Sequence, residues 1–171
     1  MNKIDATKYI LLKLCDWYFE INPSKKQNRD NDLSILKALK LIFLLAPIKF
    51  NNNSLLSNGF TFEAWALGPV EVDIYASKDQ LYIDLLQKKV QYDELHDSLE
   101  NIQIDVLFLD NIVETLKSKN KYLINLSATQ LVNLTHKYSS WITTYNSMNS
   151  KLMQNELIIT EEKFYFYDST Y

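Results

Sequence analysis

Four side chains in this chain are of the types that most often do chemistry: Cys15, Glu63, His96 and His136. A cysteine beside a base is a nucleophile, a histidine titrates near working pH, and a glutamate in an apolar site is a general acid. The four lie far apart in the sequence, and no nucleophile is marked beside His136. A single cysteine excludes an internal disulfide framework and a zinc ribbon, and two histidines leave little for a metal site. We therefore expect no enzymatic activity, no metal and no cofactor.

Each of these side chains also has a structural interpretation, which the pattern favours. Cys15 falls on the apolar side of the first predicted helix, which is typical of a small buried core residue. His96 lies in the polar stretch 93–97 and is expected in solvent. His136 is predicted to hydrogen-bond a backbone group and orient the region of Trp141, and Glu63 to form a local salt bridge or a helix cap. An enzyme that uses His136 with Glu63 or Cys15 stays open as an alternative.

The glycine and arginine contents exclude further classes of protein. The only two glycines, Gly59 and Gly68, are too few and too far apart for a phosphate-binding or dinucleotide-binding loop. The net charge is −3, and Arg29 is the only arginine. The chain therefore has few side chains that could bind phosphate or guanine in a bidentate manner. Lysine-rich loops, such as the one from 117 to 121, are expected to be solvated. Nucleic acid is therefore not an expected partner.

The spacing of apolar residues predicts a mainly α fold of six or seven helices with a short β-hairpin near residues 55–65. Asn58-Gly59 is a turn pair that would join short strands on either side of it. Pro69 suits the first position of a helix. The predicted helices cover 5–21 with Asp5 as the N-cap, 33–46 with Asp32 as the N-cap, 69–76, 79–89, 104–117, and a last one that opens at the Ser127–Gln130 capping box and carries apolar residues to 142.

The predicted helix over 33–46 is apolar around nearly its whole circumference and should be the most buried element. Only Lys37 and Lys40 indicate a face in contact with water. The longest apolar run, from Leu41 to Ala46, is far shorter than the ~20 residues that a membrane span needs. The first residues also lack the apolar stretch of a signal peptide. We expect one domain over 1–171 and a cytoplasmic location, with no membrane contact.

The C-terminal tail over 146–171 is predicted to be variable. Residues 156–159 suggest a strand, and Thr160 suggests the cap of a helix that leads into four consecutive aromatic residues. A strand over 163–167 is an almost equally good interpretation. The four aromatics form a possible interface, because Tyr and Phe are enriched where proteins meet. Docking of the same run against its own core is an equal alternative. The run consists of Phe164, Tyr165, Phe166 and Tyr167.

Two segments of the chain carry a recognisable pattern and together resemble the signatures of a known family. The first is Phe62-Glu63-Ala64-Trp65, followed by Gly68-Pro69-Val70 and Tyr75. The second begins at Leu126-Ser127-Ala128 and continues to Leu134-Thr135-His136 and Trp141. The helix over 33–46 is less closely similar to the early helix of the family. The segments stand in the order of the Panacea-domain antitoxin family, whose signatures they resemble, with the core signature over 33–141.

The resemblance implies a bacterial or phage antitoxin that neutralises a cognate protein toxin, encoded by an adjacent gene, through direct binding. A related type of member is a proteolytic adaptor that delivers a bound client to a cytoplasmic protease, and this stays as an alternative. The family is not known for an enzymatic activity. The motif residues are then architectural or partner-binding: Trp65 would anchor the turn in the core, and Thr135, His136 and Trp141 would lock the late helix against that turn. Whether the chain forms homo-oligomers stays open.

Overall fold

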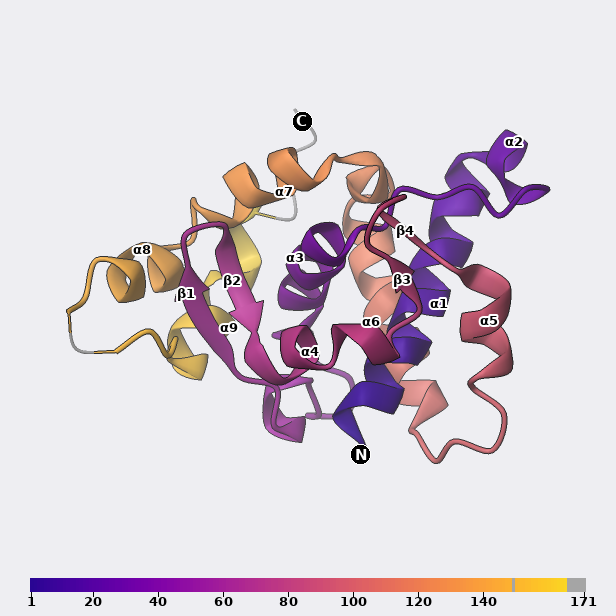
Figure 1. Cartoon of the computed structure of the whole chain (residues 1–171). Helices are drawn as coiled ribbons and strands as arrows, with labels where there is room; N and C mark the ends of the chain where they lie inside the picture. Colours follow the sequence, from indigo (N-terminus) through magenta and orange to yellow (C-terminus); the bar gives the residue numbers. More distant parts are fainter. Residues whose placement is uncertain (149, 166–171) are drawn as a thin grey trace.

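Helix α3 (Ile35–Leu45) is the element around which the rest of the chain is arranged (Figure 1). The computed structural model describes residues 1–148 and 150–165, the last five of them by their backbone alone. Every residue of α3 from Lys37 to Leu45 is buried. The helix begins at Ser34, whose side chain accepts a hydrogen bond from Lys37 N, and it packs against α1, α6, α7 and β2. The near-continuous apolar sequence of this segment explains that central place.

One side of α3 is covered by long helices. Helix α1 (Lys3–Ile21), capped by Asn2, packs on α6 (Val106–Lys119), capped by Asp105. The indole of Trp17 donates a hydrogen bond to the carbonyl of Lys121, which ties the two segments together. Shorter elements complete this side: α2 (Pro23–Lys26), α5 (Tyr92–Asp97), the 3-10 turn η3 (Leu123–Asn125) and the small hairpin of β3 (Ile83–Asp84) and β4 (Lys89–Val90).

The other side carries the main hairpin. Strand β1 (Phe62–Trp65) pairs antiparallel with β2 (Gly68–Glu71), and Trp65 lies opposite Gly68, so Ala66 and Leu67 form the turn. The outer edge of β1 is covered by the segment 151–153, since Ala64 N donates to Lys151 O and Met153 N donates to Phe62 O. Helix α4 (Val72–Ala76) and the 3-10 turn η2 (Lys78–Gln80) follow β2.

The last helices lie over this hairpin and beside α3 (Figure 1). Helix α7 (Ala128–Thr135) starts at the predicted capping box, in which Ser127 and Gln130 satisfy each other's backbone amides. Helix α8 (Ser139–Tyr145) packs on β1 and on α9 (Asn155–Tyr165). A contiguous apolar core runs from Ala6 in α1 to Ile158 in α9.

The predicted fold class is confirmed: the described chain is mainly helical with a short two-stranded hairpin. The predicted pairing within 55–65 is wrong. Asn58 ends the 3-10 turn η1 (Leu56–Asn58), and Gly59 follows it in the left-handed conformation, which is a helix-ending rather than a hairpin role. Pro69 begins no helix, because it lies in β2, and the predicted helix starts later, at Val72.

Other boundaries also differ from the predictions. Residues 79–89 form no α-helix: 79–80 end the 3-10 turn η2, and the rest forms the β3–β4 hairpin, with positive φ angles at Tyr82 just before β3 and at Lys88 just before β4. The helix predicted over 127–142 breaks at His136 and restarts at Ser139. Residues 156–159 are helical, and Thr160 lies within α9. The caps predicted at Asp5 and Asp32 are instead Asn2 and Ser34, and among the described helices none is long and apolar enough to cross a membrane.

Candidate functional site

The two family-like segments meet at the turn of the main hairpin. The indole nitrogen of Trp141 donates a hydrogen bond to the backbone carbonyl of Trp65 over 3.1 Å. The imidazole of His136 hydrogen-bonds to the backbone of Ala66, in the turn itself. The break between α7 and α8 aims both side chains at the turn. Residues about 75 positions apart in the sequence therefore hold one loop in a defined conformation.

Three rings form a continuous stack behind the turn. His136 lies on Trp141 with the ring centroids 3.9 Å apart, and Trp141 lies on Tyr145 at 4.7 Å. Burial and the nearby Lys40 ammonium lower the pKa of His136, while the hydrogen bond to Ala66 acts in the opposite direction. Its Nε2 atom is buried and has no hydrogen-bond partner among the described residues. The histidine is thus in the packing position that the sequence favoured.

Gly68 permits a close approach that no other residue allows. Its φ angle is +89°, and a Cβ atom there would lie 2.7 Å from Thr135 Oγ1 and 3.0 Å from Lys40 Cε. Both distances are shorter than a normal van der Waals contact. Thr135 Oγ1 itself donates to Val132 O over 3.0 Å. The space left by the missing side chain is therefore where α3 and α7 reach the hairpin.

Lys40 is fully buried, although the sequence suggested a face in contact with water. Its Nζ atom donates to the carbonyl of Pro69 over 2.6 Å. Burial lowers the pKa of Lys40 to about 7. Lys37 is buried as well, but it retains an ion pair with Asp32 at 2.6 Å. The sequence contained one signal for this: an apolar circumference leaves no face on which a lysine reaches water easily.

The remaining motif residues divide between core and surface. Trp65 is half-buried and packs against the edge of the core, and its indole donates to Glu63 Oε2 over 2.8 Å. The Trp65 ring contacts Tyr75 edge-on, with centroids 5.4 Å apart. Within the described part of the chain, Glu63 thus forms neither the predicted salt bridge nor a helix cap. Ser127 is exposed, while Phe62, Ala64 and Val70 are buried in the core.

An apolar groove opens between the hairpin and α3. Its main cavity, of about 400 Å³, has an almost entirely apolar lining. A second cavity of about 300 Å³ adjoins it through the shared residues Ile35 and Leu36 and extends toward Leu85. Leu67 at the hairpin turn is 59% exposed at the rim of this groove. The main cavity is lined by Ile35, Leu36, Leu39, Trp65, Ala66, Leu67, Val70 and Tyr75.

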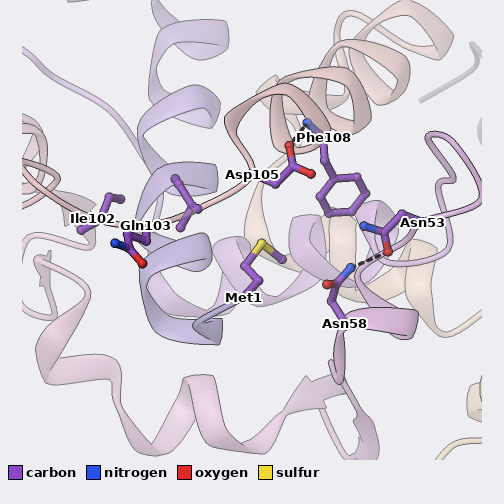
Figure 2. A pocket seen from close by; sticks show the side chains of 8 residues that line it. Met1, Asn53, Asn58, Ile102, Gln103, Asp105 and Phe108 are labelled. Atoms are coloured by element: carbon purple, nitrogen blue, oxygen red, sulfur yellow. Dashed lines mark hydrogen bonds between the residues drawn. The ribbon is translucent and has the colours of Figure 1, made fainter.

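A larger cavity lies elsewhere, near the N-terminus, and has a different character. Figure 2 shows Met1 between Phe108 and Asn58 on one side and Gln103 on the other. Its volume is about 550 Å³. The polar groups there already bind one another: Asn58 Nδ2 donates to Asn53 Oδ1 over 2.7 Å, and Asp105 caps α6. Few of its polar groups are thus free to define a ligand.

The other candidates for chemistry do not assemble into a site within the described residues. Cys15 is buried in α1, and burial raises the pKa of its thiol. His96 is exposed on α5, next to Asp97 at 3.5 Å. No group of three His, Cys, Asp or Glu side chains suited to a metal ion occurs in the part of the chain described. Of the predicted aromatic interface, Phe164 and Tyr165 are placed by backbone only, and Phe166 and Tyr167 lie outside the described residues.

The comparisons with known proteins give no family assignment. No protein-family model, curated protein or solved structure matches the chain. The resemblance to the Panacea-domain family therefore rests on the two sequence motifs alone.

Proposed function

We propose that this protein is a cytoplasmic antitoxin that neutralises a cognate protein toxin by direct binding through the groove between the main hairpin and α3. The observation that carries the proposal is the groove itself. Three residues of the first family-like motif, Trp65, Val70 and Tyr75, line it, and residues of the second motif hold its turn from behind. The motifs thus build an open apolar surface, which is the feature that protein recognition needs.

Inhibition would be steric. A segment of the toxin places apolar side chains in the groove, and the surrounding surface covers the toxin's active site or substrate entry. Complete burial of an exposed leucine such as Leu67 contributes roughly 1.5–3 kcal/mol, and a stable interface of this kind buries about 1,600 Å² in total. Trp65 and Tyr75 are of the types that dominate the binding energy of interfaces. A few side chains at the rim of the groove would therefore carry most of the affinity.

The experiment is co-expression with the product of an adjacent gene that is toxic alone. The wild-type chain should restore growth and co-purify with that product. Leu67→Asp should abolish both, because it puts a charge where the toxin is bound. Leu107→Asp is the matched control, since Leu107 is 64% exposed but lies on α6, outside the groove lining. Both variants should keep the wild-type melting temperature, because neither side chain is buried.

The variant His136→Ala tests whether His136 has a structural role or contacts the toxin directly. It removes the stack on Trp141 and should lower the melting temperature together with toxin binding. Loss of binding at unchanged stability would mean that His136 touches the toxin directly. If the adjacent product is not rescued and does not co-purify with the wild-type chain, the antitoxin proposal fails. Faster degradation of the toxin in the presence of this chain would instead support the proteolytic adaptor.

A further inference from the structure

Lys40 occupies a buried position, where a charged ammonium group is energetically unfavourable. It lies in the middle of α3, is fully buried, and donates a hydrogen bond to a neutral acceptor, the carbonyl of Pro69 in β2. Among the described ion pairs none includes Lys40, whereas the equally buried Lys37 has Asp32 at 2.6 Å. A buried charge without an opposite charge costs several kcal/mol, so the group either loses its proton or gains access to water.

The groups that face Lys40 confirm that no carboxylate compensates it. From β2 come the Pro69 carbonyl and the buried Glu71, but Glu71 is bound by the Lys3 ammonium and by two backbone amides. From α7 come Thr135, which is neutral, and His136 just after it, whose pKa Lys40 lowers.

The charged groups of α1 and α6 are directed to one another instead. Lys13 pairs with Asp110, and Lys117 pairs with Glu20 and Glu114, all at least partly exposed to water. Of the other charged groups of α1, Lys8 pairs with Asp5 on the same helix, Lys3 pairs with Glu71 and Asp73, and Asp16 accepts a hydrogen bond from Tyr92. Neither helix therefore offers Lys40 an acid.

Separating the hairpin from α3 is the simplest motion that would hydrate this ammonium. The atom that covers Nζ is a carbonyl of β2, and Gly68 beside it packs against the end of the same lysine side chain. Because burial brings the pKa of Lys40 to about 7, protonated and neutral forms coexist near neutral pH in the docked state. An undocked hairpin would restore the ordinary lysine pKa of about 10.4.

We propose that Lys40 is a positioning residue: protonation of its amine weakens the docking of the β1–β2 hairpin on α3, and loss of the proton tightens it. The hairpin turn forms one wall of the apolar groove, so Lys40 also sets the shape of the groove. That last consequence rests on the proposed function, whereas the coupling of the proton to the hairpin does not.

The first test is a direct titration of the wild-type chain by NMR, with ¹³C in the lysine side chains. One Cε resonance should titrate with a midpoint near pH 7, and it should be missing in Lys40→Met. The backbone amides of 62–68, 70 and 71 should shift with the same midpoint. If every lysine in the wild-type chain titrates above pH 10, the proposal is wrong, and this result needs no variant to fold.

The second test is hydrogen exchange as a function of pH. After correction for intrinsic chemistry, protection of the hairpin amides should rise by up to tenfold per pH unit between pH 7 and 9.5, since opening then requires uptake of a proton. Amides of α5, which lies on the other side of α3, should show no such change. Lys40→Met should abolish the dependence, and Lys37→Met, the matched control, should keep it.

A pH-independent protection in the wild-type hairpin would overturn the proposal, as would an unchanged dependence in Lys40→Met. His136→Gln distinguishes the lysine from the neighbouring imidazole: the dependence should persist in it, because the lowered pKa of His136 places its titration below this range. These outcomes are independent of any toxin. If the exchange behaves as expected but no toxin binds, Lys40 still positions the hairpin and only the antitoxin proposal fails.

Discussion

The two sides of α3 differ in how their charged groups are compensated. On the side of α1 and α6, the charged groups lie at the rim and meet in water: Lys13 contacts Asp110 at 3.2 Å, and Tyr9 donates to the same carboxylate over 2.9 Å. On the side of the main hairpin, polar side chains lie inside, as Lys40 and Thr135 do. The side of α1 and α6 thus keeps most of its charged groups at the border, although Thr7 and the paired Lys37 are buried there. The hairpin side buries the ammonium of Lys40 against a neutral carbonyl.

The difference indicates what each side is for. Ion pairs in water contribute little to stability and tolerate many geometries. A buried donor that needs one particular carbonyl acceptor tolerates very few geometries, because a hydrogen bond left unmade in the interior costs free energy. The hairpin side therefore gives up stability and gains a precisely shaped turn, which is where the apolar groove opens. Three predictions test this comparison.

The largest effect is expected for Gly68→Ala. The alanine would have to keep the positive φ angle of Gly68, which L-residues disfavour, and its Cβ atom would overlap Thr135 Oγ1. We therefore expect a loss of about 2–4 kcal/mol in the free energy of unfolding. Gly59→Ala is the control: Gly59 has φ +87°, but a Cβ added there would meet no atom within 4 Å, so the loss should be about 1 kcal/mol. Urea denaturation measures both. Equal losses would show that the contact with Thr135 and Lys40 is unimportant.

The pH dependence of stability is the second prediction. A lysine whose pKa is lowered on folding binds fewer protons in the native state, so stability rises with pH between the native and the unfolded pKa. For Lys40 this predicts a gain of about 2 kcal/mol from pH 7 to 9. Two raised pKa values act in the opposite direction: that of the buried Cys15 thiol reduces the gain above about pH 8.5, and that of Tyr9, raised to about 12, acts only above this range. Guanidinium denaturation at several pH values checks the slope.

Lys40→Met should remove most of that slope and make the chain more stable at pH 7. Part of the slope should remain, because burial lowers the pKa of Lys37 as well. A variant that keeps the whole slope would assign it to other groups. The two lysines thus separate a buried charge with a carboxylate partner from one without.

The smallest effect is expected on the other side of α3. Lys117→Gln removes the contact with Glu20, and we expect a loss of about 0.5 kcal/mol that vanishes in 1 M salt, because the glutamate is largely exposed. Thermal denaturation with and without salt measures it. A loss as large as that of Gly68→Ala would mean that the exposed ion pairs contribute as much to stability as the buried contacts of the hairpin. The proposed difference between the two sides would then be wrong.

Periodicity was enough to predict the helices that face the core on one side. The segments 5–21, 33–46 and 104–117 correspond to α1, α3 and α6 within a few residues, and the Ser127–Gln130 capping box marks the start of α7 correctly. In each case local spacing or a local hydrogen bond determines the element. The burial of Cys15 and the exposure of His96 follow from the same patterns.

The wrong predictions concern residues whose structure depends on a partner far away in the sequence. Lys40 looked solvent-exposed because its acceptor, Pro69 O, comes from 29 residues later. Pro69 looked like a helix start because nothing local shows that it pairs with Ala64 across a hairpin. Asn58-Gly59 has the composition of a hairpin turn, yet its backbone ends a 3-10 turn. The groove was missed for the same reason, since its walls come from separate segments.

The cover on the outer edge of β1 has a consequence for synthesis. Its hydrogen bonds come from Lys151 and Met153, almost ninety residues after the strand that they protect. While the chain emerges from the ribosome, the hairpin is complete long before its cover exists, and an open strand edge pairs readily with other strands. The nascent protein thus passes through a period in which this edge is exposed to aggregation, to chaperones and to proteases.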